Sequence, residues 1–422
     1  MTNDNKKYIP ALRFPEFQND EEWELTPVGK YYKVQGGFAF RSSEFKKSGI
    51  PIIRISNIPN DGIHIDTNNC VYYDRIPNGD NFHIAKGDLL IAMSGATTGK
   101  TAIYNQDGEA YLNQRVGLFR SINNQNYYPF ICQWVKSDYF YSQLNRTLAA
   151  GAQPNISGKD LESFTWVYPI GDNSYCEQKK IADCLSSLDK YIDATKRKLE
   201  QLKEHKKGLM QKLFPAKGKT LPELRFPEFS HRENWNIVSL GEVTEVVNKR
   251  NKSNRTLPVY SINNVDGFIP QSQQFDGMDS EARGYDISAY KIIGKHTFAY
   301  NPARINVGSI GYSGDLKDIL ISSLYVCFKT TDIVDDTFLM CFFNSHIFNQ
   351  AVECNVEGGI RSYLFYENFS RIKLAIPKLD EQKRIASCIM SIDCEIKKIN
   401  DKIDLLETHK NGLQQQLFPR FK

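Results

Sequence analysis

The hexapeptide LRFPEF occurs at residues 12–17 and again, letter for letter, at residues 224–229. A second block, EQKKIA at 177–182, recurs as EQKRIA at 381–386. The offset is 212 residues for the first block (12 to 224) and 204 for the second (177 to 381). The two halves of the chain therefore share their ends and differ between them, which predicts a duplicated fold with two separate centres.

The residues after each EQK block have the spacing of a long helix with one apolar seam. Apolar side chains alternate at steps of four and three residues from 181 to 213 and from 385 to 417, as in a coiled coil. Both segments run into LFP, whose proline stops the helix. Because a single apolar seam must be buried, we predict that the two helices pack antiparallel on each other within one chain. The predicted seam consists of Ile181, Leu185, Leu188, Ile192, Leu199, Leu202, Ile385, Ile389, Ile392, Ile396, Ile403 and Leu406.

Polar residues also recur in these helices. Lys206 and Lys410 occupy the same seam position, so they either align the two helices or mark where the seam opens. Glu177 and Glu381 stand where the helices begin, and a carboxylate there suits the positive end of the helix dipole. Two unrelated amphipathic helices, each packed on its own domain, are the alternative, and the narrow seam disfavours it.

The regions between the repeated blocks are predicted to be mixed α/β globules. Short β-type runs are separated by Gly, Asn, Asp and Pro, and helical stretches lie at 127–148 and 336–352. The predicted fold class is α+β, with two mixed α/β domains separated by two long antiparallel coiled-coil helices and an internal pseudo-two-fold repeat. The β-type runs are 50–55, 88–93, 115–119, 258–262, 296–300 and 319–328, and the predicted segments are 1–22 (N-terminal), 23–170 (first globule), 171–219 (first helix region), 220–378 (second globule) and 379–422 (second helix region).

Composition excludes several classes of protein. No run of eighteen apolar residues is present, so no membrane span is expected. The nine cysteines form no C-x-x-C pair in a large chain, which favours reduced thiols and a cytoplasmic location. The seven histidines never pair at ligand spacing, so a metal site is not expected. A net charge of +4 is small, so any nucleic-acid surface must come from local clustering of charge.

Two variable centres, each followed by a near-duplicate helix that begins E-Q-K-[KR]-I-A and ends L-F-P, resemble the specificity subunits of type I restriction–modification enzymes. The resemblance runs over essentially the whole chain. The family-like stretches inside the centres are 86–100, 112–116, 151–157, 300–310 and 358–362.

The resemblance implies two target-recognition domains held at opposite ends of an antiparallel helix pair. Each domain would read one half of an interrupted sequence in double-stranded DNA. The helices would set the spacing and dock two methylation subunits and the restriction (motor and nuclease) subunits. This chain would be non-catalytic and hold no cofactor, while the partner subunits would use S-adenosylmethionine, ATP and Mg²⁺.

Two other classes of function are alternatives to DNA recognition. A one-chain nuclease or methyltransferase needs a complete catalytic motif. Residues 94–101 (SGATTGKT) lack the first glycine of a P-loop, and Glu177 and Glu381 imitate the E-x-K of a nuclease without an upstream aspartate on a strand. A protein scaffold that does not bind DNA is the third class, and DNA binding with sequence preference distinguishes it.

The candidate DNA-contacting residues are polar and basic side chains of the two centres. Arginine can pair with guanine in the major groove, and asparagine or glutamine with adenine, while many other basic groups only neutralise phosphates. The strongest local charge is the cluster at 248–255, with four cations in seven residues. The candidates are Arg41, Arg54, Asn57, Lys100, Asn113, Gln114, Arg115, Gln153 and Asn155 in the first centre, and Lys249, Arg250, Lys252, Arg255, Asn263, Arg304, Asn306 and Arg361 in the second.

Overall fold

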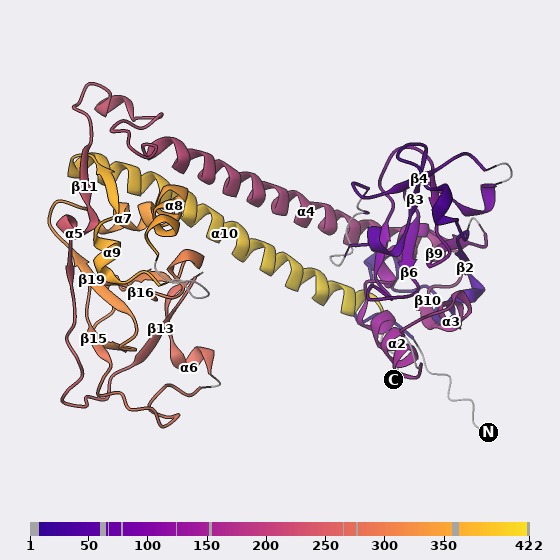
Figure 1. The fold of residues 1–422 in the computed structure, drawn as a ribbon. Coiled ribbons are helices and arrows are strands. Elements are labelled where there is room, and N and C mark those ends of the chain that lie inside the picture. The colour runs from indigo at the N-terminus through magenta and orange to yellow at the C-terminus, as the bar shows by residue number, and fades with distance from the viewer. Residues whose placement is uncertain are drawn as a thin grey trace. The chain divides into compact units, whose positions relative to one another are not determined.

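The computed structural model consists of two compact units, each taking in one globule and parts of both long helices (Figure 1). Unit 1 comprises residues 1–196 and 401–422, and unit 2 comprises residues 197–400. The predicted segment boundaries follow the repeated blocks instead, and they stay a prediction. The structure describes residues 8–59, 65, 67–76, 79–123, 125–151, 154–264, 266–275, 277–356 and 363–419.

The globule of unit 1 contains two four-stranded sheets and one two-stranded sheet. Their strand orders are β2-β9-β6-β7, β4-β3-β8-β5 and β1-β10. Three helices, α1, α2 and α3, lie between β9 and β10 in the chain. The strands are β1 (Glu24–Pro27), β2 (Tyr32–Gly36), β3 (Ile50–Ile53), β4 (Val71–Tyr73), β5 (His83–Ile84), β6 (Leu89–Ala92), β7 (Thr101–Ile103), β8 (Ala110–Leu112), β9 (Val116–Ser121) and β10 (Thr165–Tyr168), and the helices are α1 (Tyr128–Trp134), α2 (Asp138–Ala149) and α3 (Gly158–Ser163).

The globule of unit 2 repeats this topology strand for strand. Its sheets have the orders β12-β19-β16-β17, β14-β13-β18-β15 and β11-β20, which are those of unit 1 with ten added to each strand number. The strands are β11 (Asn236–Ser239), β12 (Thr244–Val246), β13 (Val259–Asn263), β14 (Gly267–Pro270), β15 (Lys291–Ile293), β16 (Phe298–Tyr300), β17 (Ile310–Tyr312), β18 (Ile319–Ile321), β19 (Val326–Thr330) and β20 (Lys373–Ile376), and the helices are α5 (Leu240–Val243), α6 (Gln271–Gln274), α7 (Asp336–Phe343), α8 (His346–Asn355) and α9 (Tyr366–Ser370). The α+β class and the internal repeat are thus confirmed, and the repeat extends through the centres, where the sequences differ.

Three of the predicted runs are each divided where polar residues interrupt them. Each predicted helical stretch is two helices, because Ser137 and Ser345 cap a new helix by accepting the N–H groups of Phe140 and Phe348. The run 319–328 is also two strands, since the chain turns between them with the N–H of Tyr325 donating to the carbonyl of Ser322. The predicted type of structure is found in all three places, and the capping serines and the turn divide each run into two elements.

The long helices are α4 (Ser174–Leu213) and α10 (Leu379–Leu417), and they pair antiparallel within each unit. In unit 1, Ile181 and Leu185 near the start of α4 share a core with Leu417 at the end of α10. In unit 2, Leu213 at the end of α4 shares a core with Ile385 and Ile389 near the start of α10. All twelve predicted seam residues are buried or half-buried.

The matched lysines of the seam both form ion pairs with the opposite helix. Lys410 pairs with Asp189 in unit 1, and Lys206 pairs with Asp393 at 2.6 Å in unit 2. The two pairs are related by the repeat offset of 204 residues (189 to 393, and 206 to 410). These contacts favour the interpretation that the lysines align the helices.

The first turn of α4 holds a buried carboxylate that ties down the N-terminal repeat block. Glu177 accepts from Nε and Nη2 of Arg13 at 2.7 and 2.8 Å and from the indole N–H of Trp23 at 3.1 Å. The neighbouring Gln178, fully buried, accepts the N–H of Tyr127 at 2.9 Å. The EQ pair therefore joins the N-terminal segment, the globule and the long helix, which is a larger role than the dipole interaction predicted for it.

Unit 2 repeats this anchor in every contact. Glu381 accepts from Arg225 at two distances of 2.8 Å and from the indole of Trp235 at 3.2 Å. Gln382, also buried, accepts the N–H of Asp335 at 2.8 Å. The recurrence of both repeat blocks is thus explained by one set of contacts made twice, although the blocks lie eight residues closer together in the second half.

No helix in the described parts of the chain has the length and apolar content to cross a membrane.

We expect Arg13→Ala to destabilise unit 1 by about 3–5 kcal/mol, because it leaves the Glu177 carboxylate buried without its cation. Lys46→Ala removes an exposed pair with Asp74 in the same unit and should cost less than about 1 kcal/mol. Urea unfolding followed by tryptophan fluorescence reports mainly on unit 1, which contains Trp23, Trp134 and Trp166. Equal effects of the two substitutions would show that the anchor is not needed.

The Asp189 carboxylate gives the helix pair of unit 1 a defined pH dependence. Burial raises its pKa, but the charges and hydrogen bonds of Lys136 and Lys410 outweigh burial and hold the pKa below its ordinary value. A depressed pKa stabilises the fold above the unfolded pKa of about 3.9, and this contribution is lost as the pH falls further. We expect Asp189→Asn to be less stable than the unsubstituted chain by about 1–3 kcal/mol at pH 7. The difference should shrink between about pH 5 and pH 3, and a difference that grows in that range would contradict the assignment.

Candidate nucleic-acid interface

Most of the predicted DNA-contacting residues lie on loops that correspond between the two units. The β2–β3 loop corresponds to β12–β13, the β6–β7 loop to β16–β17, and the β8–β9 turn to β18–β19. The segment that follows α2 corresponds in the same way to the segment that follows α8. The residues on these loops are Arg41, Lys100, Asn113, Gln114, Arg115 and Asn155 in unit 1, and Lys249, Arg250, Lys252, Arg255, Arg304 and Asn306 in unit 2.

Unit 1 brings three of these residues together in one open groove of about 620 Å³. Gln114, Arg115 and Asn155 are all exposed, and they line it together with residues 93–95 and with Pro154 and Ile156. The groove is therefore built from three loops and presents one guanidinium and two carboxamides, which are the groups suited to reading guanine and adenine.

Backbone hydrogen bonds hold the three loops in place. The N–H of Met93 donates to the carbonyl of Arg115 at 2.9 Å, and the N–H of Ile156 donates to the carbonyl of Met93 at 2.9 Å. The Thr98 hydroxyl donates to the carbonyl of Pro154 at 2.6 Å. Because two of these three hydrogen bonds join backbone groups, the side chains of Gln114, Arg115 and Asn155 can change without changing the frame of the groove.

The start of α3 anchors the far end of the groove loop. The side chain of Asp160 accepts from the hydroxyl and the N–H of Ser157 at 2.6 and 2.8 Å. These hydrogen bonds lower the pKa of Asp160 below its ordinary value, so the cap stays ionised at neutral pH. The segment that carries Asn155 is thus fixed on both sides.

Other predicted residues of unit 1 lie elsewhere. Arg41 is exposed and pairs with Glu44 at 3.6 Å, Arg54 and Lys100 are half-buried, and Asn113 is a turn residue that accepts the N–H of Arg115 at 3.3 Å. Asn57 is a correction. Only 2% of it is exposed, and its Oδ1 accepts the N–H of Arg54 at 3.0 Å, so it closes a helical turn and presents no group to a base. Gln153 and Arg361 lie outside the described residues.

The basic cluster of unit 2 is organised around a residue that the sequence reasoning passed over. Asn251 is fully buried, and its side chain bonds both the N–H and the carbonyl of Arg255, at 2.9 and 3.0 Å. Lys249, Arg250 and Lys252 are exposed on the same loop. The role of Asn251 could have been predicted from the sequence, because an asparagine flanked by cations and followed by turn-forming residues commonly closes a loop with its side chain.

Arg255 itself is engaged, because it pairs with Asp318 at 3.1 Å. Asn263 is half-buried, and its side chain bonds both the N–H and the carboxylate of Asp266, at 2.6 and 3.0 Å, in the β13–β14 turn. Its contact with DNA stays a prediction.

The remaining loops of unit 2 mix polar and apolar side chains. Arg304 and Asn306 are exposed in the β16–β17 loop, beside Val307 with 57% of its surface exposed. The β18–β19 turn, which is one residue longer than the β8–β9 turn, presents Leu324 with 78% of its surface exposed. Counted from the preceding strand, Leu324 stands at the position of Arg115 in unit 1. The two units thus offer different chemistry on equivalent loops, and the apolar members were missed because exposed Val and Leu carry no motif.

The site chemistry does not support a catalytic or metal centre on the described residues. Residues 94–100 form a β-hairpin loop between β6 and β7 and not the strand–loop–helix of a nucleotide site. Glu177 is saturated by Arg13 and Trp23. Within the described ranges no group of three or more His, Cys, Asp or Glu is arranged to hold a metal ion.

Comparison with known proteins gives a consistent result over both halves. The type I restriction modification DNA specificity domain matches residues 20–204 and again residues 232–408. The chain is 27% identical to the type I restriction enzyme MjaVIII specificity subunit of Methanocaldococcus jannaschii over 201 residues, which cover 47% of this chain and 46% of that one. It is 25% identical over 395 residues to the putative MjaX specificity subunit of the same organism, covering 90% and 89%.

Solved structures share the fold. The S subunit of the type I restriction–modification system from M. genitalium has a TM-score of 0.60 at 15% identity, with 98% of this chain and all of that one covered. A second solved chain comes from a study of complex assembly and conformational transition in the type I restriction–modification system. It has a TM-score of 0.54, and the match covers 94% of this chain and 97% of that one. Two matches of one domain, at the two halves that the repeat defines, place this chain in the family of type I restriction–modification DNA specificity subunits.

Proposed function

We propose that this chain recognises double-stranded DNA for a type I restriction–modification complex, with each globule reading one half of an interrupted target. The observation that carries the proposal is that the two globules have the same strand order but different side chains on their corresponding loops. The same strands hold a polar groove in unit 1 and a basic and apolar loop set in unit 2. Two globules with the same strand order can meet the two half-sites of a duplex in equivalent ways. Because their loops carry different side chains, the two halves of the target have different sequences.

The loop chemistry suggests how each half is read. In unit 1, Arg115 can pair with guanine, and Gln114 and Asn155 with adenine. In unit 2, Lys249 and Lys252 can neutralise phosphates, while Leu324 offers an apolar contact for a thymine methyl group. The basic loop therefore positions the duplex and the neighbouring loops supply selectivity.

The helices are proposed to set the spacing between the half-sites and to dock two methylation subunits and the restriction subunits. Exposed apolar side chains on α10 support a docking role, since Met390 and Leu405 are 54% and 68% exposed. As a specificity subunit the chain is non-catalytic. Adenine methylation with S-adenosylmethionine and ATP- and Mg²⁺-dependent cleavage are assigned to the partner subunits.

The groove of unit 1 gives a direct test. In the assembled complex, Gln114→Ala with Arg115→Ala should weaken binding to the target duplex by about 1–3 kcal/mol for each base pairing lost, or about 5- to 150-fold. Binding to a scrambled duplex should change much less, because base contacts carry the discrimination. Methylated adenines mapped with the locus intact and deleted define the target, and fluorescence anisotropy measures both affinities.

Lys86→Ala is the matched control, because Lys86 pairs with Asp107 on an exposed loop outside the groove. An equal loss of affinity for both duplexes in the groove variant would mean that these residues contact the DNA backbone only.

Modularity gives a second test. Replacing residues 23–170 with the matching region of a related subunit should change one half of the methylated target and leave the other half intact. The physical reason is that the strands of this globule pair only with one another among the described residues, and one of its two apolar cores lies wholly within 23–170. Methylation mapping of cells that carry the chimera measures the outcome. An active chimera in which both halves have changed would show that the two globules read jointly.

A further inference from the structure

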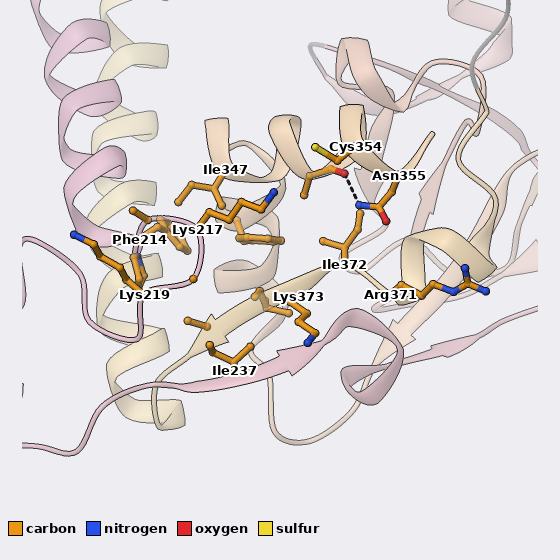
Figure 2. Close-up of a pocket in the computed structure, with 17 residues that line it drawn as sticks. Phe214, Lys217, Lys219, Ile237, Ile347, Cys354, Asn355, Arg371, Ile372 and Lys373 are labelled. Carbon is orange, nitrogen blue, oxygen red and sulfur yellow. Dashed lines mark hydrogen bonds between the residues drawn. The ribbon is translucent and has the colours of Figure 1, made fainter. Parts of the chain in front are cut away.

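Unit 2 contains an apolar pocket of about 320 Å³ that takes no part in the DNA-reading loops (Figure 2). It lies between the end of α4 with the loop that follows it, helix α8, and the strands β11 and β20. Phe214, Ile237, Ile347 and Leu374 supply apolar walls, and Ile237 is 47% exposed. Such a surface favours a partly apolar ligand.

The rim of the pocket is basic. Lys217, Lys219 and Lys373 are exposed lining residues, and none of them forms an ion pair with another residue in the described part of the chain. Arg371 also lines the pocket, but it pairs with Glu367 at 2.7 Å. No Asp or Glu is among the described lining residues, so the rim attracts anionic groups.

One wall of the pocket is the open edge of a strand. Among the described strands β20 pairs with β11 alone, and the N–H of Leu240 donates to the carbonyl of Ile372. Because peptide groups alternate in direction along an antiparallel strand, the N–H and carbonyl of the next residue, Lys373, point away from β11. No other described residue bonds them, so the pocket has an unpaired donor and an unpaired acceptor along one wall.

Unit 1 shows what occupies this position when it is filled. Gln143 of α2 accepts the N–H of Thr165 at 2.8 Å and donates to its carbonyl at 2.8 Å. Thr165 is the counterpart of Lys373 on the edge strand, because each follows the residue whose carbonyl accepts the bond from the partner strand. A carboxamide, which has the donor and acceptor of a peptide group, thus completes the edge in unit 1.

Unit 2 lacks this carboxamide. The caps Ser137 and Ser345 align α2 with α8, so the counterpart of Gln143 is Ala351. Alanine cannot reach or bond the strand edge. The nearby Asn355 turns to the carbonyl of Ala351 instead, at 2.8 Å, as the dashed line in Figure 2 shows.

We propose that this pocket binds a short, extended, acidic segment of a partner protein. A peptide group of the segment takes the place that the Gln143 amide fills in unit 1, accepting the N–H of Lys373 and donating to its carbonyl. An apolar side chain of the segment packs on Ile237, Ile347 and Leu374, and flanking carboxylates meet Lys217 and Lys219. This is recognition by strand addition combined with charge complementarity.

A DNA backbone is a poorer occupant. It would meet the lysines, but it carries no group for the apolar walls and would leave the Lys373 peptide group unpaired. The proposal does not depend on which bases the globules read, so DNA binding and segment binding can fail separately.

The test uses the full chain and a fluorescein-labelled seven-residue peptide, blocked at both ends, in which valine and isoleucine alternate with glutamate. We expect saturable anisotropy. Ala351→Gln, which copies unit 1, should weaken binding at least tenfold, and Lys217→Glu with Lys219→Glu should weaken it about tenfold. Asn349→Gln places the same new side chain on an exposed position of α8 outside the pocket and should leave binding unchanged.

Two further probes locate the contact. A peptide methylated on its central backbone nitrogen loses the strand bond and should bind several-fold more weakly. A bromoacetyl-tagged peptide should alkylate Cys354, an exposed lining residue, in preference to Cys394, which is exposed on α10 outside the pocket.

Absence of saturable binding, or binding that Ala351→Gln leaves unchanged, would overturn the proposal. A second outcome would also overturn it. If Lys217→Glu with Lys219→Glu weakens binding to a random 30-base-pair duplex and leaves peptide binding unchanged, the rim is a DNA contact. Peptide binding lost in Ala351→Gln with duplex binding retained supports it.

Discussion

The structure depends on a buried carboxylate in the first turn of each long helix. Glu177 and Glu381 each bind an arginine and a tryptophan from a segment that lies more than a hundred residues earlier in the chain. Removing the two charges from water costs about as much free energy as their attraction contributes. The main effect of the ion pair is therefore to select one arrangement of the folded chain. No other partner in the neighbourhood satisfies the carboxylate, and this fixes how the N-terminal segment, the globule and the helix are joined.

The same constraint explains why the repeated blocks lie at the ends of each half. LRFPEF supplies the arginine and EQK supplies its carboxylate and the glutamine that bonds the globule. Between these fixed points the sequence is free to change, provided that the strand order is kept. In the described parts of the chain, the two globules have the same strand order with different residues, which shows how far that freedom extends.

The two globules share one strand order but differ in sequence, and this makes them chemically different in two places. On the loops the divergence places Arg115 in unit 1 where unit 2 has Leu324, which changes what a half-site must offer. Beneath the sheets it places Gln143 where unit 2 has Ala351, which closes one strand edge and leaves the other open. On equal frames, the difference between Gln143 and Ala351 thus decides whether the neighbouring helix bonds the strand edge.

The sequence by itself determined the duplication, the two long helices with their seams, the α+β class and the loops on which polar residues gather. These features are periodic or local, and spacing along the chain reports them directly. Tertiary structure decided which of those polar residues face outward. Asn57 and Asn263 have the same chemistry as a base-reading asparagine, yet they close turns, because an asparagine side chain bonds a nearby backbone group as readily as a base. The partners of Glu177 and the groove that Gln114 and Asn155 line together involve residues far apart in the chain, and only the folded structure brings them to one place.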